Sequence, residues 1–255
     1  MSSKLWAIAR YTLLEYLRGR VVRGVLLLLL VTSILGWLLA SAALTEGDAL
    51  RASLGGALLR IALVFLLAVT VIVSQVREAS DRTRDWLLAF PLPRTIWLAG
   101  RLLGHGIAAI VLAAAAGASL ALFGGLEPAA LWTCGLALEL LICAVMAVFL
   151  SLTVPHASAA FLAFAGWYVL ARSMPALQLI AANPTLADST AGPWLIQHTL
   201  NGIGLLLPRL DLFASGLWLE GGGHWSQLAV PLAQTLSYCG LIAAASVIDL
   251  QRSEW

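Results

Sequence analysis

Two ionisable residues, Glu139 and Arg172, stand inside long apolar runs and are the first candidates for chemistry in this chain. A charged side chain at the centre of a membrane costs about 2.5–3.5 kcal/mol even on insertion scales, so it implies a partner or a function. Glu139 lies nine residues after the start of the run 130–153, and Arg172 lies seven residues before the end of the run 157–179. At ~1.5 Å per helical residue, both sit roughly 10–14 Å from the same surface. We therefore expect them to form an intramembrane ion pair or to line a substrate path.

A second candidate is the charged segment between the second and third apolar runs, residues 76–101. Its residues 82–88 can form one or two helical turns that lie flat on the membrane, with the tryptophan and the two leucines facing an apolar surface. Such an element is suited to docking a soluble partner, whereas the simpler alternative is a hairpin that only follows the positive-inside rule. The candidate docking residues are Glu78, Arg82, Thr83, Trp86, Leu87, Leu88, Pro91 and Arg94.

The chain carries no pattern for ATP hydrolysis, metal binding or a disulfide framework. A phosphate-binding P-loop needs a Gly-rich turn that ends in Gly-Lys, and Lys4 is the only lysine. The three cysteines are far apart and the four histidines are scattered. The stretch Gly117-Ala118-Ser119 superficially resembles an intramembrane serine nucleophile, but it lacks a general base within reach, and its small residues favour close helix packing. We expect no enzymatic activity, no metal or cofactor in this chain, and no nucleic acid partner.

The composition is that of a helical membrane protein. Of the 255 residues, 61% are hydrophobic and 11% are charged, whereas soluble domains have an apolar share of about 45–50%. Runs of about 20 apolar residues can cross ~30 Å of hydrocarbon as helices. Because they are apolar all round, they do not have the alternating pattern of β-barrel strands. We expect an all-α membrane protein with one domain over residues 1–255 and six spans near 25–44, 55–76, 102–123, 130–153, 157–179 and 228–249.

The distribution of basic residues predicts the orientation. Most of the 15 lysines and arginines lie in the N-terminal flank, in the segment 76–101 and at the C-terminus. The positive-inside rule places these parts, and hence both termini, in the cytoplasm. Arg60 and His105 lie nearer span ends, where they could snorkel to the interface. The first run could instead be a signal peptide cleaved near Ala42, but its basic lead and its apolar stretch are both too long for one.

Two segments outside the spans have patterns of their own. Residues 3–20 place apolar side chains near helical spacing, which predicts an amphipathic helix in the membrane interface, either as an anchor or as part of a docking surface. The outer segment 180–227 is rich in Gly, Pro and polar residues. We expect short helices there that cap or partly re-enter the outer mouth, with Pro208, Leu210 and Phe213 as an outer gate. A surface loop without a gating role is the alternative.

These features together resemble the permease subunit of ABC-2 type ATP-binding-cassette transporters, and the resemblance covers essentially the whole chain. It rests on the order of the interfacial helix, the six spans and the cytoplasmic pattern Glu78…Arg82-Thr83…Leu87-Leu88…Pro91…Arg94…Gly100-Arg101. The outer Leu207-Pro208…Leu210…Phe213 element and the tail Asp249…Arg252…Glu254 follow. The chain looks most similar to permeases for copper-enzyme maturation, such as that of nitrous oxide reductase. In that group Lys is usual where Arg101 stands, so the charge is kept.

The resemblance implies that two copies of the chain form the path of an exporter or flippase in the bacterial inner membrane. Two cytoplasmic ATPases, which bind ATP and Mg, would drive it. Residues 77–90 would be the coupling helix that fits a groove on the ATPase. A periplasmic partner is compatible with this assignment, and the transported substrate is left open. The alternative is a non-transporting membrane scaffold or assembly factor that docks cytoplasmic proteins through the same segment.

Overall fold

A computed structural model of the chain describes residues 2–18, 21–42, 47–81, 93–182 and 191–252. These residues form helices joined by short turns, and no strand occurs among them. The elements in chain order are α1 (Ser2–Arg18), α2 (Val21–Ala42), α3 (Gly47–Ser80), α5 (Arg94–Gly124), α6 (Leu126–Thr153), α7 (Ala157–Ala182), α8 (Ala191–Leu206), the short turns η1 (Leu210–Leu212), η2 (Trp218–Gly222) and η3 (Trp225–Leu228), and α9 (Ala229–Arg252). The all-α prediction is confirmed for this part of the chain.

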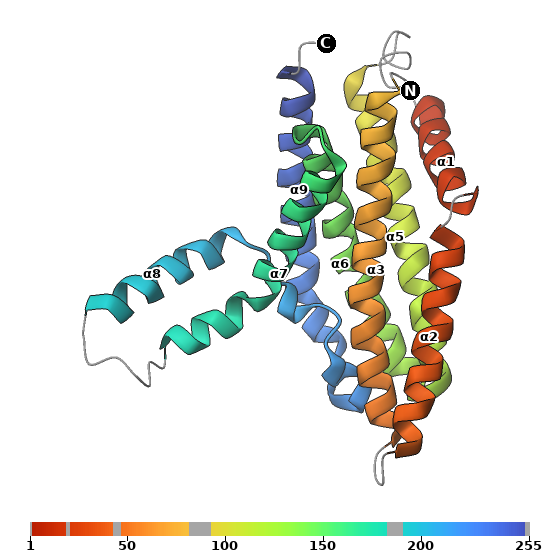
Figure 1. Ribbon diagram of the computed structural model, residues 1–255, viewed down its shortest axis with the longest axis vertical. Coiled ribbons are helices and arrows are strands. Elements are labelled where there is room, and N and C mark those ends of the chain that lie inside the picture. The colour runs from red at the N-terminus through yellow and green to blue at the C-terminus, as the bar shows by residue number, and fades with distance from the viewer. Residues whose placement is uncertain (1, 19–20, 43–46, 82–92, 183–190, 253–255) are drawn as a thin grey trace.

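The helices form a bundle around α6, which packs against α3, α5, α7 and α9. The two N-terminal helices cover one side, because α1 packs on α5 and α2 packs on α3 (Figure 1). Both chain ends lie at the same end of the bundle, where α3 also ends and α5 begins (Figure 1). The two helices that flank the candidate docking segment therefore meet α1 and the last turn of α9 at one end of the molecule.

Within the described residues, five helices are long and apolar enough to cross a membrane: Ala52–Ser80, Arg94–Leu122, Leu126–Thr153, Ala157–Ala182 and Trp225–Arg252. The chain is therefore a multi-pass membrane protein by length and composition. The first predicted span lies in α2, of which Val21–Leu35 is counted only as a shorter apolar helix. Several helices extend beyond the predicted spans, because the prediction counted apolar residues alone and a helix continues into its charged flanks.

The amphipathic N-terminal segment forms α1, and α1 runs alongside α5 instead of crossing the end of the bundle (Figure 1). Two glycines of α5 allow this close approach. A Cβ atom added at Gly104 would lie 2.6 Å from Cβ of Thr12, and one added at Gly100 would lie 2.8 Å from Cβ of Ile8. Ala9 and Thr12 are fully buried as a result. The depth of α1 in the membrane remains a prediction.

The helix pair α5–α6 is packed just as closely. A Cβ atom added at Gly117 would lie only 1.7 Å from Oγ1 of Thr133 on α6. The Ser119 hydroxyl donates a 2.7 Å hydrogen bond to the Ala116 carbonyl of its own helix, as a serine does when it packs within a helix. These contacts agree with the packing interpretation of the stretch around Gly117.

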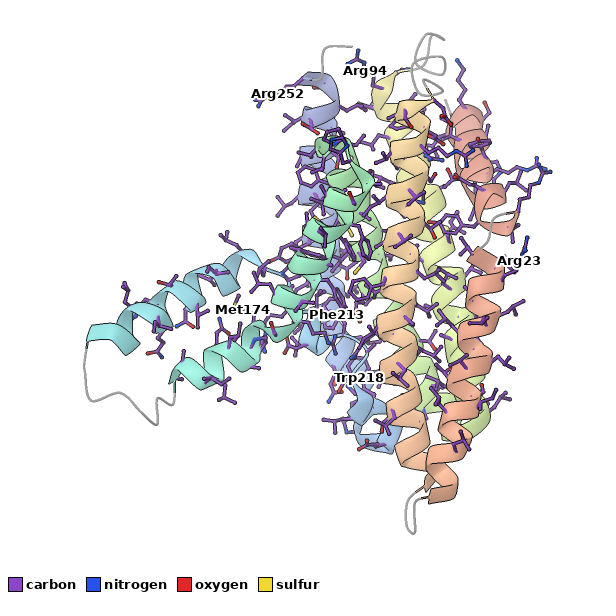
Figure 2. The ribbon with its side chains drawn as sticks, in the orientation of Figure 1. Arg23, Arg94, Met174, Phe213, Trp218 and Arg252 are labelled. Carbon is purple, nitrogen blue, oxygen red and sulfur yellow. The ribbon has the colours of Figure 1, made fainter. Side chains whose placement is uncertain are left out.

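The second half of α7 leaves the bundle and forms a projecting arm with α8 (Figure 1). Pro175 lies inside α7. A proline there cannot donate the hydrogen bond to the residue four positions earlier, and its ring crowds that carbonyl, so the helix bends. After α8 the chain returns to the bundle through η1, η2 and η3, where Leu210, Phe213 and Trp218 are buried (Figure 2). In the described part of the stretch 180–227, α8 and three short turns follow α7; their expected role in capping the outer mouth stays a prediction.

Candidate functional site

The described residues contain two clusters of buried charge, one at each of two levels of the bundle. The first is centred on Arg101 near the start of α5, and we call it the Arg101 cluster. Its guanidinium is 1% exposed and lies 2.8 Å from Oε1 of Glu78 and 3.4 Å from Oε2 of Glu15. It also donates to the hydroxyls of Ser74 at 3.0 Å and Thr12 at 3.2 Å. One arginine of α5 is therefore tied to both α1 and α3.

Regular helix spacing explains why the acceptors converge on Arg101. Ser74 and Glu78 are four residues apart on α3, and Thr12 and Glu15 are three residues apart on α1, so each pair lies on one helix face. Two carboxylates and two hydroxyls satisfy most of the donors of a planar guanidinium. Sequence reasoning had counted Arg101 as a positive charge of the loop and as the last residue of the cytoplasmic pattern, but it did not predict that Arg101 contacts α1.

A buried Tyr–His pair continues the Arg101 cluster one turn further along α5. The hydroxyl of Tyr16 lies 2.8 Å from Nδ1 of His105. Burial raises the pKa of the Tyr16 phenol, so the hydroxyl stays protonated and can donate this hydrogen bond. His105 is 1% exposed, and its Nε2 has no partner among the described residues. The suggestion that His105 snorkels to the interface was wrong, because α1 covers it.

Two contacts anchor the flanks of the candidate docking segment. On the α3 side Glu78 is held by Arg101. On the α5 side the guanidinium of Arg94 donates a 3.0 Å hydrogen bond to the carbonyl of Leu250 in the last turns of α9. The remaining predicted docking residues, Arg82, Thr83, Trp86, Leu87, Leu88 and Pro91, lie outside the described residues. Their role in docking stays a prediction.

The second cluster is centred on Glu139 of α6, and we call it the Glu139 cluster. The side chain of Glu139 is fully buried. Its Oε1 accepts a 2.8 Å hydrogen bond from the hydroxyl of Tyr168 and lies 3.4 Å from Nη1 of Arg172. Its Oε2 has no partner among the described residues. Counting residues along two antiparallel spans had predicted that Glu139 and Arg172 are neighbours. The structure brings the two side chains together.

Arg60 of α3 adds a second guanidinium to the Glu139 cluster. Arg60 is buried and interacts electrostatically with Glu139 and Tyr168. The suggestion that Arg60 snorkels to an interface was wrong, because the segment after α8 covers it. Sequence reasoning placed it by counting from a predicted span end, and α3 continues beyond that end to Gly47.

Both arginines of the Glu139 cluster hold the backbone of the segment 208–214. Nη1 of Arg60 donates a 2.8 Å hydrogen bond to the carbonyl of Ala214, and Nη1 of Arg172 donates to the carbonyl of Leu210. The predicted gate residues Pro208, Leu210 and Phe213 are buried in or beside this segment. The structure therefore joins two predictions made separately, the intramembrane charges and the gate segment.

A cavity of about 300 Å³ lies beside the Glu139 cluster, between α7 and α8. Its lining includes Met174, Gln178, Gly204 and Arg209. Ala171 and Pro208, which also line it, are close in sequence to Arg172 and Leu210 of the cluster. The cavity is mixed in character, with amide and guanidinium groups among apolar side chains.

Among the described residues, no group of three or more His, Cys, Asp or Glu side chains could hold a metal ion. In both clusters, buried charges are compensated by ion pairs and hydrogen bonds. No family model matches the chain, and no curated protein matches it significantly.

Proposed function

We propose that the chain is the permease subunit of an ATP-driven exporter or flippase of the ABC-2 type. In this proposal the protein spans the bacterial inner membrane six times, with α2 as the first span and both termini in the cytoplasm. Two copies form the translocation path, and a separate cytoplasmic ATPase in two copies binds ATP and Mg and supplies the energy. The absence of a P-loop from the sequence supports a separate ATPase.

The observation that carries the proposal is the anchoring of both flanks of the segment 82–92. Glu78 ties the end of α3 to Arg101, and through Arg101 to α1. Arg94 ties the start of α5 to α9 through the carbonyl of Leu250. A force applied to the segment by a bound partner would therefore act on four helices at once. A hairpin that only obeys the positive-inside rule has no need of such contacts on both sides.

The Glu139 cluster supports a gating role for the segment 208–214. Arg60 and Arg172 hold this segment through two carbonyl groups, and η1 is a single short turn. Releasing these two hydrogen bonds would loosen the segment without unfolding a spanning helix. We propose that this release opens one end of the path.

The first test is purification of the tagged protein from its native membrane in a mild detergent, followed by mass spectrometry of the proteins that co-purify. We expect a stoichiometric P-loop ATPase, and we expect Leu88→Glu to abolish its recovery. Ser80→Glu is the matched control, because it adds the same charge to an exposed residue of α3 just before the segment. Recovery of the permease alone, or with partners that Leu88→Glu does not affect, would favour the scaffold.

A second test separates a transporter from a scaffold that happens to bind an ATPase. The co-purified complex is reconstituted into vesicles, and its ATPase rate is compared for the parent and Arg60→Met. A transporter requires the gate and the ATPase to be coupled, so the rate should change by several-fold when Arg60 is removed. An unchanged rate would mean that the Glu139 cluster is not part of an energised path.

A further inference from the structure

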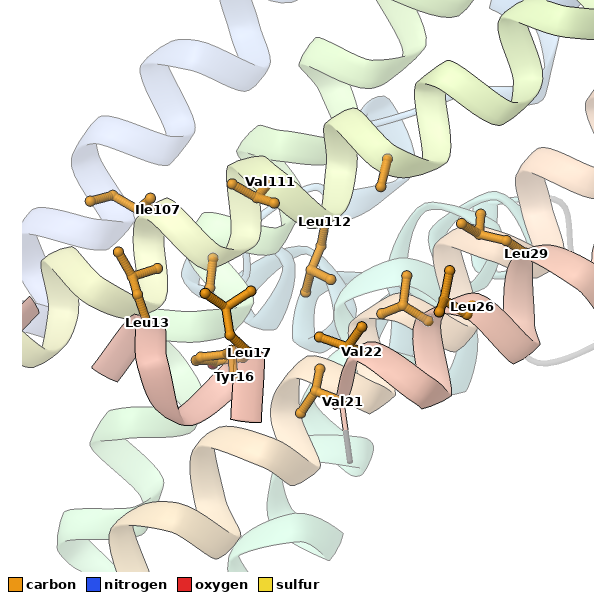
Figure 3. Close-up of a pocket in the computed structure, with 13 residues that line it drawn as sticks. Leu13, Tyr16, Leu17, Val21, Val22, Leu26, Leu29, Ile107, Val111 and Leu112 are labelled. Carbon is orange, nitrogen blue, oxygen red and sulfur yellow. The ribbon is translucent and has the colours of Figure 1, made fainter. Parts of the chain in front are cut away.

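A groove at the junction of α1, α2 and α5 plays no part in the proposed function (Figure 3). Its volume is about 390 Å³, within the range of ~300–1,000 Å³ that small-molecule sites occupy. Leu13 and Leu17 of α1 form one end, and Val22 and Leu26 of α2 continue along it. Residues of α5 including Val111 form the facing wall (Figure 3).

The lining of the groove is hydrocarbon almost throughout. Apart from Tyr16, every lining residue is Leu, Val, Ile or Ala. The Tyr16 hydroxyl is already bound to Nδ1 of His105, so it is not available to orient a polar ligand. The groove therefore suits a flexible apolar chain and offers nothing to a polar or charged group.

The groove opens onto the outer surface of the helix bundle. Leu17, Leu26 and Val111 are all exposed at its edges, and all three would face lipid in a membrane protein of this kind. Lipid acyl chains are the apolar chains present at this surface in large excess. An acyl chain is accordingly the occupant that matches both the lining and the surroundings.

The charge around the groove selects a lipid class. Arg10, Arg18 and Arg23 of α1 and α2 are exposed, and Arg10 lies one turn before Leu13 while Arg23 lies one turn before Leu26. The only acidic residue of these two helices is Glu15, whose carboxylate is bound to Arg101. Guanidinium groups near a membrane surface attract anionic lipids and form charge-assisted hydrogen bonds with phosphate.

We propose that this groove is a binding site for an anionic phospholipid. One acyl chain lies between α1–α2 and α5, and the phosphate is held by the arginines of α1 and α2. The lipid fills the angle between α1 and α2 and so helps to hold α1 against α5. This inference requires only that the chain is a membrane protein, and it does not depend on an ATPase partner.

The test is native mass spectrometry of the purified protein titrated with phosphatidylglycerol or with phosphatidylcholine of the same acyl chains. We expect one phosphatidylglycerol molecule to bind about tenfold more tightly than phosphatidylcholine, because the guanidinium groups of α1 and α2 attract an anionic headgroup at the membrane surface. Equal binding of the two lipids by the parent protein would overturn the choice of an anionic headgroup.

Variants in the groove locate the site. Ala115→Phe fills the α5 wall, and Val22→Trp fills the opposite wall, so each should remove the tightly bound phosphatidylglycerol. Ala114→Phe is the matched control, because it makes the same change at an exposed neighbour outside the lining and should bind lipid as the parent does. Combined Arg18→Gln and Arg23→Gln should abolish the preference for phosphatidylglycerol and leave phosphatidylcholine binding unchanged.

Two results would overturn the proposal. One is full retention of phosphatidylglycerol in both Ala115→Phe and Val22→Trp, and the other is an equal loss in Ala114→Phe. Thermal unfolding of each variant, measured on the same sample, shows whether it is folded. Leu88→Glu should leave lipid binding intact, so failure here is distinguishable from failure of the proposed function.

Discussion

The Arg101 cluster and the Glu139 cluster use the same residue types with opposite balances of charge. Arg101 is one guanidinium between the carboxylates of Glu15 and Glu78. Glu139 is one carboxylate that pairs with the guanidinium of Arg172 and interacts electrostatically with that of Arg60. Each buried charge is compensated, as the cost of burying an isolated ion requires.

The two clusters differ most in what their arginines hold. Among the described residues, every hydrogen-bond or ion-pair partner of Arg101 is a side chain on a regular helix. Arg60 and Arg172 also hold backbone carbonyls of the irregular segment 208–214. A contact between two helices breaks only if one of the helices moves. An irregular segment can leave its contacts while the helices stay in place. In the function proposed above, the Arg101 cluster is a fixed joint between helices and the Glu139 cluster is a releasable latch on the segment 208–214.

The largest expected effect is that of Arg101→Met on stability. The change removes the buried guanidinium that pairs with the carboxylates of Glu78 and Glu15, and breaking one side of a buried ion pair costs about 3–5 kcal/mol. Thermal unfolding of the purified protein in detergent should show a large fall in Tm. Arg77→Met is the control, because the Arg77–Asp81 pair is exposed and such pairs contribute ~0–1 kcal/mol. Similar Tm values for the two variants would contradict a fixed joint.

Glu139→Gln should come next. The amide can keep the hydrogen bond from Tyr168 but loses the charge that faces Arg172 and Arg60. Both arginines retain their carbonyl acceptors, so we expect a loss of about 2 kcal/mol, the size of a hydrogen bond to a charged group. The same unfolding assay measures it. A loss larger than that of Arg101→Met would reverse the comparison between the two clusters.

Arg60→Met tests the latch more directly. Removing the hydrogen bond to the Ala214 carbonyl should destabilise the held conformation of the segment 208–214 by about 1 kcal/mol. This corresponds to roughly a fivefold increase in the population of the released conformation. A cysteine placed at Ser215, in a background without the three native cysteines, should react faster with a maleimide by about that factor. Arg209→Met is the control on the same segment, because its guanidinium pairs with Asp211 only two residues away. Equal labelling rates in the two variants would rule out a latch.

Tyr16→Phe should have the smallest effect, about 1 kcal/mol, because it removes one buried hydrogen bond to His105. The same variant also tests how the stability of the fold depends on pH. The pKa of Tyr16 is raised on folding, so above the unfolded value of ~10 the unfolded chain releases its proton first and stability falls. The parent should lose stability more steeply above pH ~10 than Tyr16→Phe does. Tyr11→Phe, at an exposed tyrosine of the same helix, should match the parent.

The sequence predicted the parts of the structure that depend on distance along a helix. Glu139 and Arg172 were placed at one depth by counting residues on two antiparallel runs, and the structure brings them within 3.4 Å. The all-helical class followed from apolar runs that are uniform around the helix. Both results rest on a regular rise per residue, which a sequence carries directly.

The sequence did not predict contacts made by covering elements. Arg60 and His105 lie near the ends of apolar runs, yet both are buried. They are covered by the segment after α8 and by α1, and neither element lies near them in sequence. The departure of α7 at Pro175 was missed for another reason, because the residues after it remain apolar. The Gly100…Gly104 spacing was a readable sign that a helix would pack closely on α5.

The docking of α1 on α5 also has a consequence for biosynthesis. Thr12 and Glu15 meet Arg101 across 89 and 86 residues of sequence. At ~5–20 residues per second, the ribosome needs about 4–18 s to make the partner of α1 after α1 itself. During that interval α1 has neither the glycines of α5 to pack against nor Arg101 as the counter-ion of Glu15. α1 therefore reaches these contacts only after α2, α3 and the first part of α5 have been made, and the insertion machinery or the membrane surface must hold it until then.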